Sequence, residues 1–441
     1  MADSDMSKPG FYGWKLLAAF WVILFINLAF PAYGSSVINA YMVADLSLDR
    51  RTLGLMVSVY MMMSGLPGPF VAMFVNRYGV RATLVVGSGI LMLGAVSMAT
   101  FVDTGLEAII VFGFIVGFGV MSGGALAAQT GTAFWFVRRR ALAIALILSA
   151  GGIGGFIAAR TLNSLINAFD GNWRAGWWLI AAMALVSIVV AAIFVREKPQ
   201  DMGQLPDGGI AEDDGSISRK ASRVHITKEE WTFGEVLKSP ALWLLLFGSL
   251  GMSGGFTQAM AHAIVHLQDL GNTTDVAAKS FSILVVSTLI GKLMLGIFGD
   301  RIDPRYLWAI AVGVFGIGLL ILIDATTTLK LYIYSVCIGF GFGGGLVCMM
   351  TVMSNYFGSK AYASVIGITL AVQTTIGALA SFIAGDLYER QGSYTLAFVG
   401  TAVLCFAGTL TLLVIRPPRR PRPEGVSEEM KEEGLLPHAK T

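Results

Sequence analysis

Twelve apolar runs, each about as long as a membrane-spanning helix, recur along this chain of 441 residues. A bilayer core about 30 Å thick requires roughly 20 apolar residues in a helix. In the first part of the chain the runs cover 12–33, 52–75, 82–102, 107–134, 140–168 and 175–195. In the second part they cover 241–268, 277–299, 306–324, 331–355, 362–388 and 394–415. Only 13% of the residues are charged, against about 25% in soluble domains. The sequence therefore predicts an all-α membrane protein with twelve transmembrane helices in two six-helix halves.

Polar segments set the expected boundaries between the parts of the chain. We expect an N-terminal six-helix half at 1–195, a cytoplasmic linker at 196–239 and a C-terminal six-helix half at 240–416. Within the linker, Lys228–Leu237 is expected to form a short amphipathic stretch. The segment 417–441 is rich in Pro, Arg and Glu and is expected to be a disordered cytoplasmic tail.

The distribution of Lys and Arg predicts the orientation. With the N-terminus inside, 23 of the 31 basic residues fall in inside segments and 6 in outside loops. Arg160 and Lys292 remain within spans. Cytoplasmic loops carry the excess of basic residues in membrane proteins, so both termini are expected to be cytoplasmic, in a plasma (inner) membrane. The net charge of +3 does not suggest nucleic-acid binding.

An internal repeat relates the two halves. Three pairs of short segments match at offsets of 221–224 residues, namely Asn76-Arg77 with Asp300-Arg301, 117–119 with 339–341, and Trp135-Phe136 with Tyr356-Phe357. The segment 339–344 also fits the G-x-G-x-x-G pattern of dinucleotide binding. That pattern requires a strand before a helix, whereas this segment lies inside an apolar run, so we interpret it as helix packing.

Two segments resemble the loop signature of the major facilitator superfamily, G-x-x-x-D-R-x-G-R-R. Ala72–Arg81 reads AMFVNRYGVR and Gly296–Arg305 reads GIFGDRIDPR. The resemblance implies a gate on the cytoplasmic side formed by Arg77, Arg81, Asp300 and Arg301. Asn76 replaces the acidic residue of the first copy and lacks its charge.

Further segments resemble the monocarboxylate transporter and oxalate/formate antiporter families. Trp135–Gly154 is similar to their pattern of an aromatic-Phe pair, basic residues and a glycine-rich stretch. Gly10–Trp14 is a partial match to a first-span signature, and His266–Gly271 is similar to a seventh-span ending of bacterial relatives. The resemblance implies transport of small organic anions. At the position of Lys292 these families place an arginine.

Lys292 is the strongest candidate for a substrate-binding residue. It lies eight residues before Asp300, about 12 Å into the membrane at 1.5 Å per residue. An ionisable residue at that depth is costly and marks a functional site, unless it is paired with a structural carbonyl. No Asp or Glu lies convincingly at the midplane, so an anionic ligand is the natural partner of this ammonium group.

Other polar residues within the spans are weaker candidates. Arg160 either contacts substrate or extends to the outer interface, and His262, which shares a helix face with His266, either titrates or packs. Thr288 lies one turn before Lys292. Mid-span amides either bind substrate or tie helices together: Asn27, Gln129, Gln258 and Gln373.

The predicted function is secondary transport of small organic anions, most simply monocarboxylates, by alternating access with a proton. A dicarboxylate exchanger and a drug-efflux carrier remain alternatives, and a non-transporting membrane sensor is the alternative from another class.

No paired carboxylates, nucleophile triad or metal cluster suggests an enzyme, a cofactor or a metal site. Cys337, Cys348 and Cys405 lie in apolar runs and are interpreted as packing residues. The expected partners are the substrate anion, a proton and the bilayer, and the protein is expected to be a monomer.

Overall fold

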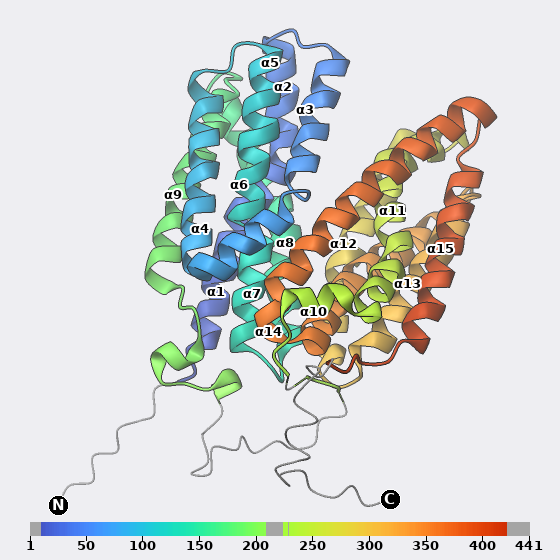
Figure 1. Cartoon of the computed structure of the whole chain (residues 1–441). Coiled ribbons are helices and arrows are strands. Elements are labelled where there is room, and N and C mark those ends of the chain that lie inside the picture. The colour runs from blue at the N-terminus through green and yellow to red at the C-terminus, as the bar shows by residue number, and fades with distance from the viewer. Residues whose placement is uncertain (1–9, 209–223, 228, 421–441) are drawn as a thin grey trace, which may run out of the picture.

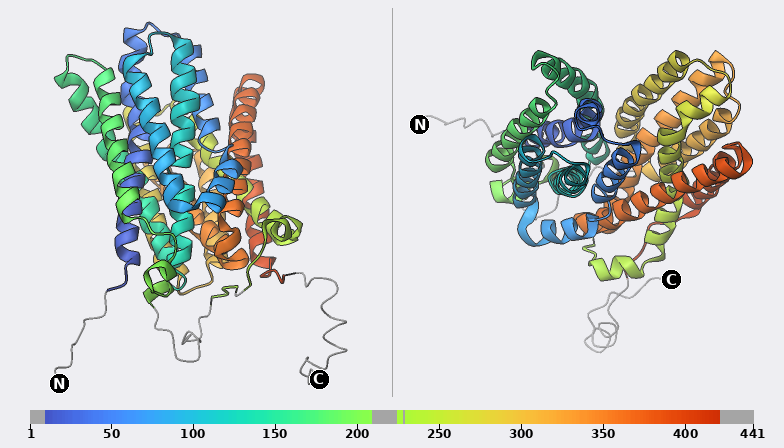
Figure 2. Two further views of the ribbon diagram at one scale, coloured as in Figure 1. Left: turned by 60° about the vertical axis from the view of Figure 1, so that its left-hand side comes forward. Right: turned by 90° about the horizontal axis from the view of Figure 1, so that it is seen from above.

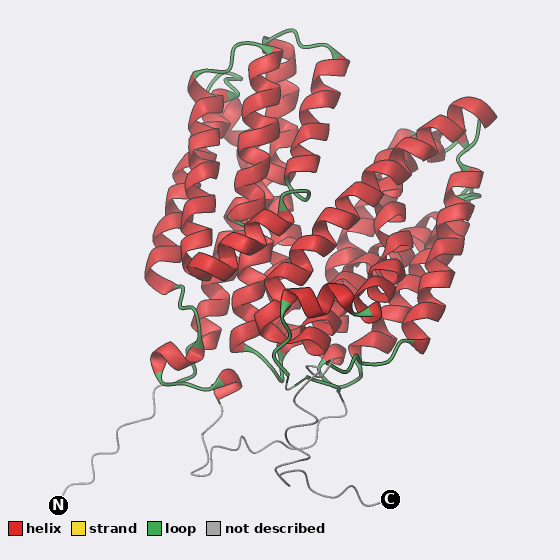
Figure 3. Cartoon of the chain, in the orientation of Figure 1, coloured by secondary structure: helices red, strands yellow, loops and turns green. Residues whose placement is uncertain are grey.

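The computed structural model describes residues 10–208, 224–227 and 229–420, which form helices joined by short loops (Figure 3). The helices of the N-terminal half are α1 Gly13–Leu24, η1 Phe25–Gly34, α2 Ser35–Asp45, α3 Arg50–Met63, α4 Gly68–Thr100, α5 Gly105–Ala108, η2 Ile109–Val116, α6 Gly117–Ser122, α7 Ala125–Trp135, α8 Arg140–Ala168 and α9 Arg174–Phe194. The helices of the C-terminal half are α11 Pro240–Asp269, α12 Thr274–Gly299, α13 Pro304–Leu322, α14 Thr328–Gln391 and α15 Thr395–Val414.

Ten helical stretches of the described chain are long and apolar enough to cross a membrane. The two longest, Arg51–Thr100 and Thr328–Gln391, have 50 and 64 residues. Each contains a glycine with positive φ, +89° at Gly79 and +74° at Gly358, a conformation that residues with a Cβ rarely adopt. Counting each of these stretches as two crossings gives the twelve expected spans.

The two halves form separate bundles that lie side by side (Figures 1 and 2). We call the end of the molecule where α1 begins and α15 ends the linker end, because residues 196–239 connect the halves there (Figure 1). The opposite end is called the far end.

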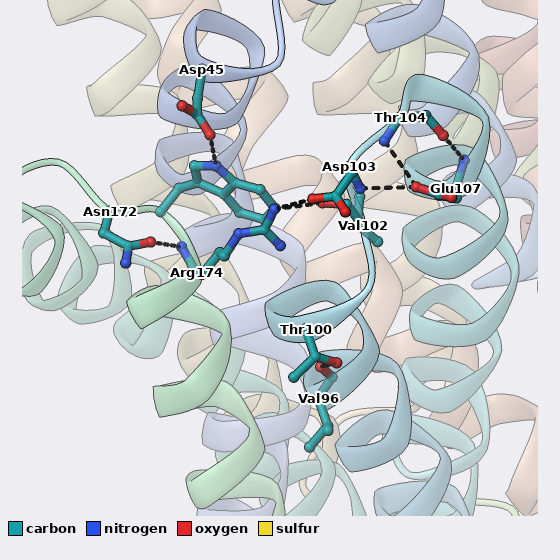
Figure 4. A network of polar contacts seen from close by, with 10 residues as sticks. Asp45, Val96, Thr100, Val102, Asp103, Thr104, Glu107, Asn172 and Arg174 are labelled. Carbon is teal, nitrogen blue, oxygen red and sulfur yellow. Dashed lines mark hydrogen bonds and ion pairs between the residues drawn. The ribbon is translucent and has the colours of Figure 1, made fainter.

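Polar contacts tie together the helices of the N-terminal half at the far end (Figure 4). The indole N–H of Trp173, just before α9, donates to Asp45 at the end of α2 over 2.9 Å. Arg174 forms a 2.7 Å ion pair with Asp103, which follows α4. The backbone N–H of Asp103 in turn donates to Glu107 of α5 over 2.9 Å. Four of the six spans are thus fixed to one another, which favours movement of this half as one body.

Glycines allow close packing inside the C-terminal half. A Cβ built on Gly339 would lie 2.2 Å from the carbonyl oxygen of Leu284, and one on Gly343 would lie 2.0 Å from that of Thr288. Both contacts are with α12. The segment 339–344 lies within α14, so its glycines serve helix packing.

The linker contains short helices: η3 Pro199–Met202, η4 Pro206–Gly208 and α10 Phe233–Lys238. The side chain of Thr232 and that of Glu235 cap the start of α10 reciprocally. This helix falls at the end of the amphipathic stretch expected at 228–237, of which residue 228 lies outside the described residues. Most of the tail expected at 417–441 also lies outside them.

Candidate substrate site and gate

The halves meet along two seams, which we call the α8–α12 seam and the α4–α14 seam. Glycines bring the backbones together at both. A Cβ built on Gly296 would lie 2.3 Å from the Cβ of Ala145, and one on Gly68 would lie 2.3 Å from the carbonyl oxygen of Gly367. The bundles diverge toward the far end (Figure 1). The hydrogen bonds described below that join the halves lie toward the linker end, which is closed.

Lys292 lies in the α8–α12 seam. Its side chain is 9% exposed, and Nζ donates to the carbonyl oxygen of Leu148 in the other half over a long 3.4 Å. Within the described residues, no carboxylate forms an ion pair with Lys292. A carbonyl group supplies a partial charge only, so the ammonium group is buried without neutralisation. Both interpretations of Lys292 from the sequence therefore hold in part. The residue contacts a structural carbonyl, and its ammonium group still lacks a counter-charge among the described residues.

Gln129 of α7 is fully buried. Within the described part of the chain, neither its amide nitrogen nor its amide oxygen has a hydrogen-bond partner. Leaving such a group unsatisfied costs about 1–3 kcal/mol. It lies six residues from the end of α7, about 9 Å from the linker end of the helix and so at a depth similar to that of Lys292. Helix α7 contacts both α8 of its own half and α14 of the other. Gln129 is therefore the neutral polar candidate whose amide nitrogen and amide oxygen are both without a partner in the described structure.

Several other candidates use their side chains to join helices within one half. Asn27 of η1 donates to Ser88 and to the carbonyl oxygen of Gly123, both over 2.8 Å. Gln258 of α11 donates to the carbonyl oxygen of Ala380 over 3.0 Å and accepts from Thr401 over 2.9 Å. These bonds engage both amide atoms of Gln258 but only the amide nitrogen of Asn27, whose amide oxygen has no partner among the described residues. They favour the packing interpretation of both residues.

The remaining candidates in the C-terminal half are also engaged. Nε2 of His262 lies 3.1 Å from the carbonyl oxygen of Ser381. The amide of Gln373 donates to the sulfur of Met349 over 3.0 Å. The hydroxyl of Thr288 donates to Leu284 within its own helix over 3.0 Å. The structure thus does not show these three side chains bonded to Lys292.

Arg160 lies far from Lys292. It is twelve residues after Leu148 on α8, about 18 Å farther toward the far end. Its guanidinium group lies 5.5 Å from the ring centre of Phe156. Arg160 is exposed, as are Phe156 and Ile157 at 71% and 41%. This exposed apolar neighbourhood favours extension of Arg160 to the membrane interface.

Asp300 forms the main polar contact across the α8–α12 seam at the linker end. Its carboxylate accepts the backbone N–H groups of Ala141 and Leu142, at 2.9 and 3.2 Å. These are the first free N–H groups of α8, where a negative charge is stabilised by the helix dipole. Burial nevertheless raises the pKa of Asp300 to about 6, because the loss of hydration outweighs these bonds and the nearby guanidinium of Arg140.

The repeat-related residue, Asn76, makes the corresponding contact in the α4–α14 seam. Its amide donates to the hydroxyl of Ser364 in α14 over 2.8 Å. A third bond joins the halves at this end, where Arg140 donates to the side-chain oxygen of Asn355 over 2.9 Å. Neither Arg140 nor Asn355 was predicted as a gate residue from the sequence. Arg140 belongs to the basic motif within Trp135–Gly154, but no sequence pattern indicates that Asn355 is its partner.

Arg77, Arg81 and Arg301 do not show a bond across the seams in the described structure. Arg77 lies over the ring of Tyr78 at 5.2 Å. The guanidinium of Arg81 donates to the carbonyl oxygen of Ala192, and its backbone N–H donates to Glu197 over 2.9 Å. The first contact joins α4 to α9, and the second joins α4 to the segment that follows α9. Arg301 is exposed. The gating role of these arginines stays a prediction.

Comparison with known proteins decides the family. The profile described as Major Facilitator Superfamily matches residues 16–381 and 263–440. The chain belongs to this superfamily. The predicted all-α membrane fold is confirmed for this multi-pass transporter, and a structure of the E. coli fucose:proton symporter FucP shares the fold. Its TM-score is 0.66 at 14% identity, over 90% of this chain and 97% of that one.

Curated relatives of the transporter include monocarboxylate transporters. Monocarboxylate transporter 13 of Bos taurus is 24% identical over 94% of this chain and 92% of its own length. Human monocarboxylate transporter 2 is 22% identical over 92% and 85%. An agnestins efflux protein of Paecilomyces divaricatus is 23% identical over 54% and 49%. The resemblance to the monocarboxylate transporter family is thereby confirmed.

Proposed function

We propose that this transporter carries small monocarboxylate anions by alternating access, with a proton as the coupling ion. The observation that carries the proposal is Lys292, which is buried between the halves and has no counter-charge among the described residues. A carboxylate that enters from the far end supplies the missing charge. Gln129 offers donors and an acceptor of its own at a similar depth.

The proposed cycle follows from the two ends of the molecule. The linker end is closed by Asp300, Arg140 and Asn76. Binding of the anion neutralises Lys292 and lowers the electrostatic cost of closing the site away from water. The halves then rock so that the far end closes and the bonds at the linker end break. We propose that the linker end faces the cytoplasm, because it holds the excess of Lys and Arg.

The test is uptake of a labelled monocarboxylate by proteoliposomes. Lys292→Ala should lower the initial rate at least about 100-fold, and K292R should retain part of it, because the charge remains. Lys279→Ala is the matched control, since Lys279 lies on the same helix, is exposed and already pairs with Asp275. Uptake by K292A at the wild-type rate would refute the role of Lys292.

Coupling is tested in the same vesicles. An inward proton gradient should raise the initial rate of uptake, and a protonophore should abolish that increase. Uptake that depends on a loaded counter-anion and ignores the proton gradient would indicate exchange. Preference for a dicarboxylate in a competition panel would change the substrate class.

Export is a second candidate, favoured by one relative named as an efflux protein. Orientation-resolved vesicles separate the two directions. Under a physiological proton gradient, net accumulation on the linker side supports uptake, and net loss from that side supports efflux.

A further inference from the structure

A groove lies on the C-terminal half at the linker end, between the start of α11 and the end of α15. Its volume is about 690 Å³. The residues used below are Leu244, Leu410, Val414, Arg416 and Arg419, which line it together with Ser239 and Pro240. It is separate from the seams between the halves.

One part of the groove is apolar and exposed. Leu244 of α11 is 43% exposed, and Leu410 and Val414 of α15 are 65% and 78% exposed. These residues belong to membrane-spanning helices, so their exposure matches contact with acyl chains. Trp243, which precedes Leu244 in α11 and is 54% exposed, is the kind of residue enriched at membrane interfaces.

The other part of the groove is basic. Arg416 and Arg419 are exposed and follow directly on the end of α15, and Lys238 lies just before α11. Within the described residues, no acidic side chain pairs with these three cations. The neighbouring Glu235 is already engaged by Arg420 at 2.9 Å. Among the described residues the positive charge therefore has no acidic partner at the level where the helices leave the membrane.

We propose that this groove binds an anionic phospholipid of the leaflet on the linker side. The phosphate contacts the guanidinium groups of Arg416 and Arg419, which match its geometry. An acyl chain lies along Leu244, Leu410 and Val414. Basic pockets between membrane helices attract anionic headgroups. A phosphatidylcholine binds more weakly, since its own cation faces the same arginines.

The experiment counts lipids bound to the purified full chain by native mass spectrometry, in titrations with phosphatidylglycerol and with phosphatidylcholine. Wild type should prefer phosphatidylglycerol. R416Q/R419Q should weaken its binding about tenfold or more, because two phosphate contacts are lost. The matched control is K15Q/R139Q, which removes two exposed cations at the linker end of the N-terminal half. It should leave the preference unchanged.

A second variant tests the apolar wall. L410W fills the groove while all cations remain, and it should reduce the number of tightly bound phosphatidylglycerol molecules by one. Unchanged binding by R416Q/R419Q, or an equal loss in K15Q/R139Q, would overturn the proposal. Displacement of the lipid by inorganic phosphate at equal concentration would do the same, because it would indicate a site for soluble anions.

Discussion

The two seams between the halves are related by the internal repeat, yet they differ in charge. In the α8–α12 seam, the carboxylate of Asp300 accepts from the start of α8, and Lys292 lies deeper without a counter-charge. In the α4–α14 seam, the corresponding contact is the neutral bond from Asn76 to Ser364. Duplication has kept the arrangement, in which a polar residue near the linker end of a span contacts a helix of the other half. Of these contacts in the described structure, those of the α8–α12 seam are charged and that of the α4–α14 seam is neutral. We infer that the α8–α12 seam is the one that responds to anions and protons.

The largest effect is expected from blocking the neutral seam. Gly68→Val places a side chain where even a Cβ would lie 2.3 Å from the carbonyl oxygen of Gly367. Because a backbone atom cannot move aside, the population with a closed linker end should fall more than about tenfold. Distances between spin labels on the two halves at the linker end measure this population. Gly89→Val is the control, since a Cβ there has no contact within 4 Å. If G68V had the same closed population as the wild type, close contact of the backbones in this seam would not be required for closure.

The next effect compares the two gates directly. D300A removes the acceptor of two backbone N–H groups, and leaving buried donors unsatisfied costs about 1–3 kcal/mol. N76A removes one neutral, partly buried bond, worth about 0.5 kcal/mol. The closed population should fall about tenfold in D300A and about twofold in N76A, as read from the same distances. Equal effects of the two substitutions would contradict the proposed asymmetry.

A smaller effect is expected from pH. In the closed arrangement, burial raises the pKa of Asp300 to about 6, and in an open gate the carboxyl is hydrated and its pKa returns toward 3.8. The closed state therefore binds the proton more tightly, and its stability increases as the pH falls through about 6. Between pH 7.5 and 5.5 the ratio of closed to open molecules should rise a few-fold. D300N should abolish this pH dependence of the closed-to-open ratio. A pH dependence that persists in D300N would show that another group titrates.

The smallest effect is expected at Arg160. The structure places this residue about 18 Å from Leu148 along α8, beside exposed apolar side chains. R160Q should change the KM for the transported anion less than about twofold in proteoliposomes. An increase of tenfold or more in this KM would indicate that Arg160 lies on the substrate path. The charged seam would then extend to the far end.

The sequence predicted the fold well, for a simple physical reason. The length of an apolar run is set by the thickness of the bilayer, so each span can be recognised without knowledge of its neighbours. The repeat was visible because residues at loop ends, such as Asn76 and Asp300, keep their position in both halves. Residue 292 was also prominent, because a charge within an apolar run is conspicuous in any arrangement.

The roles of the buried amides were decided by the tertiary structure alone. Asn27 and Gln129 look alike in the sequence, as mid-span amides with equal need of a partner. Within the described residues the amide nitrogen of Asn27 donates two bonds, whereas neither amide atom of Gln129 has a partner. Helical periodicity tells which face of a helix a residue occupies, but not which helix meets that face. The partner of Asp300 lies 159 residues away, and only the packing of the two halves brings that carboxylate to the start of α8.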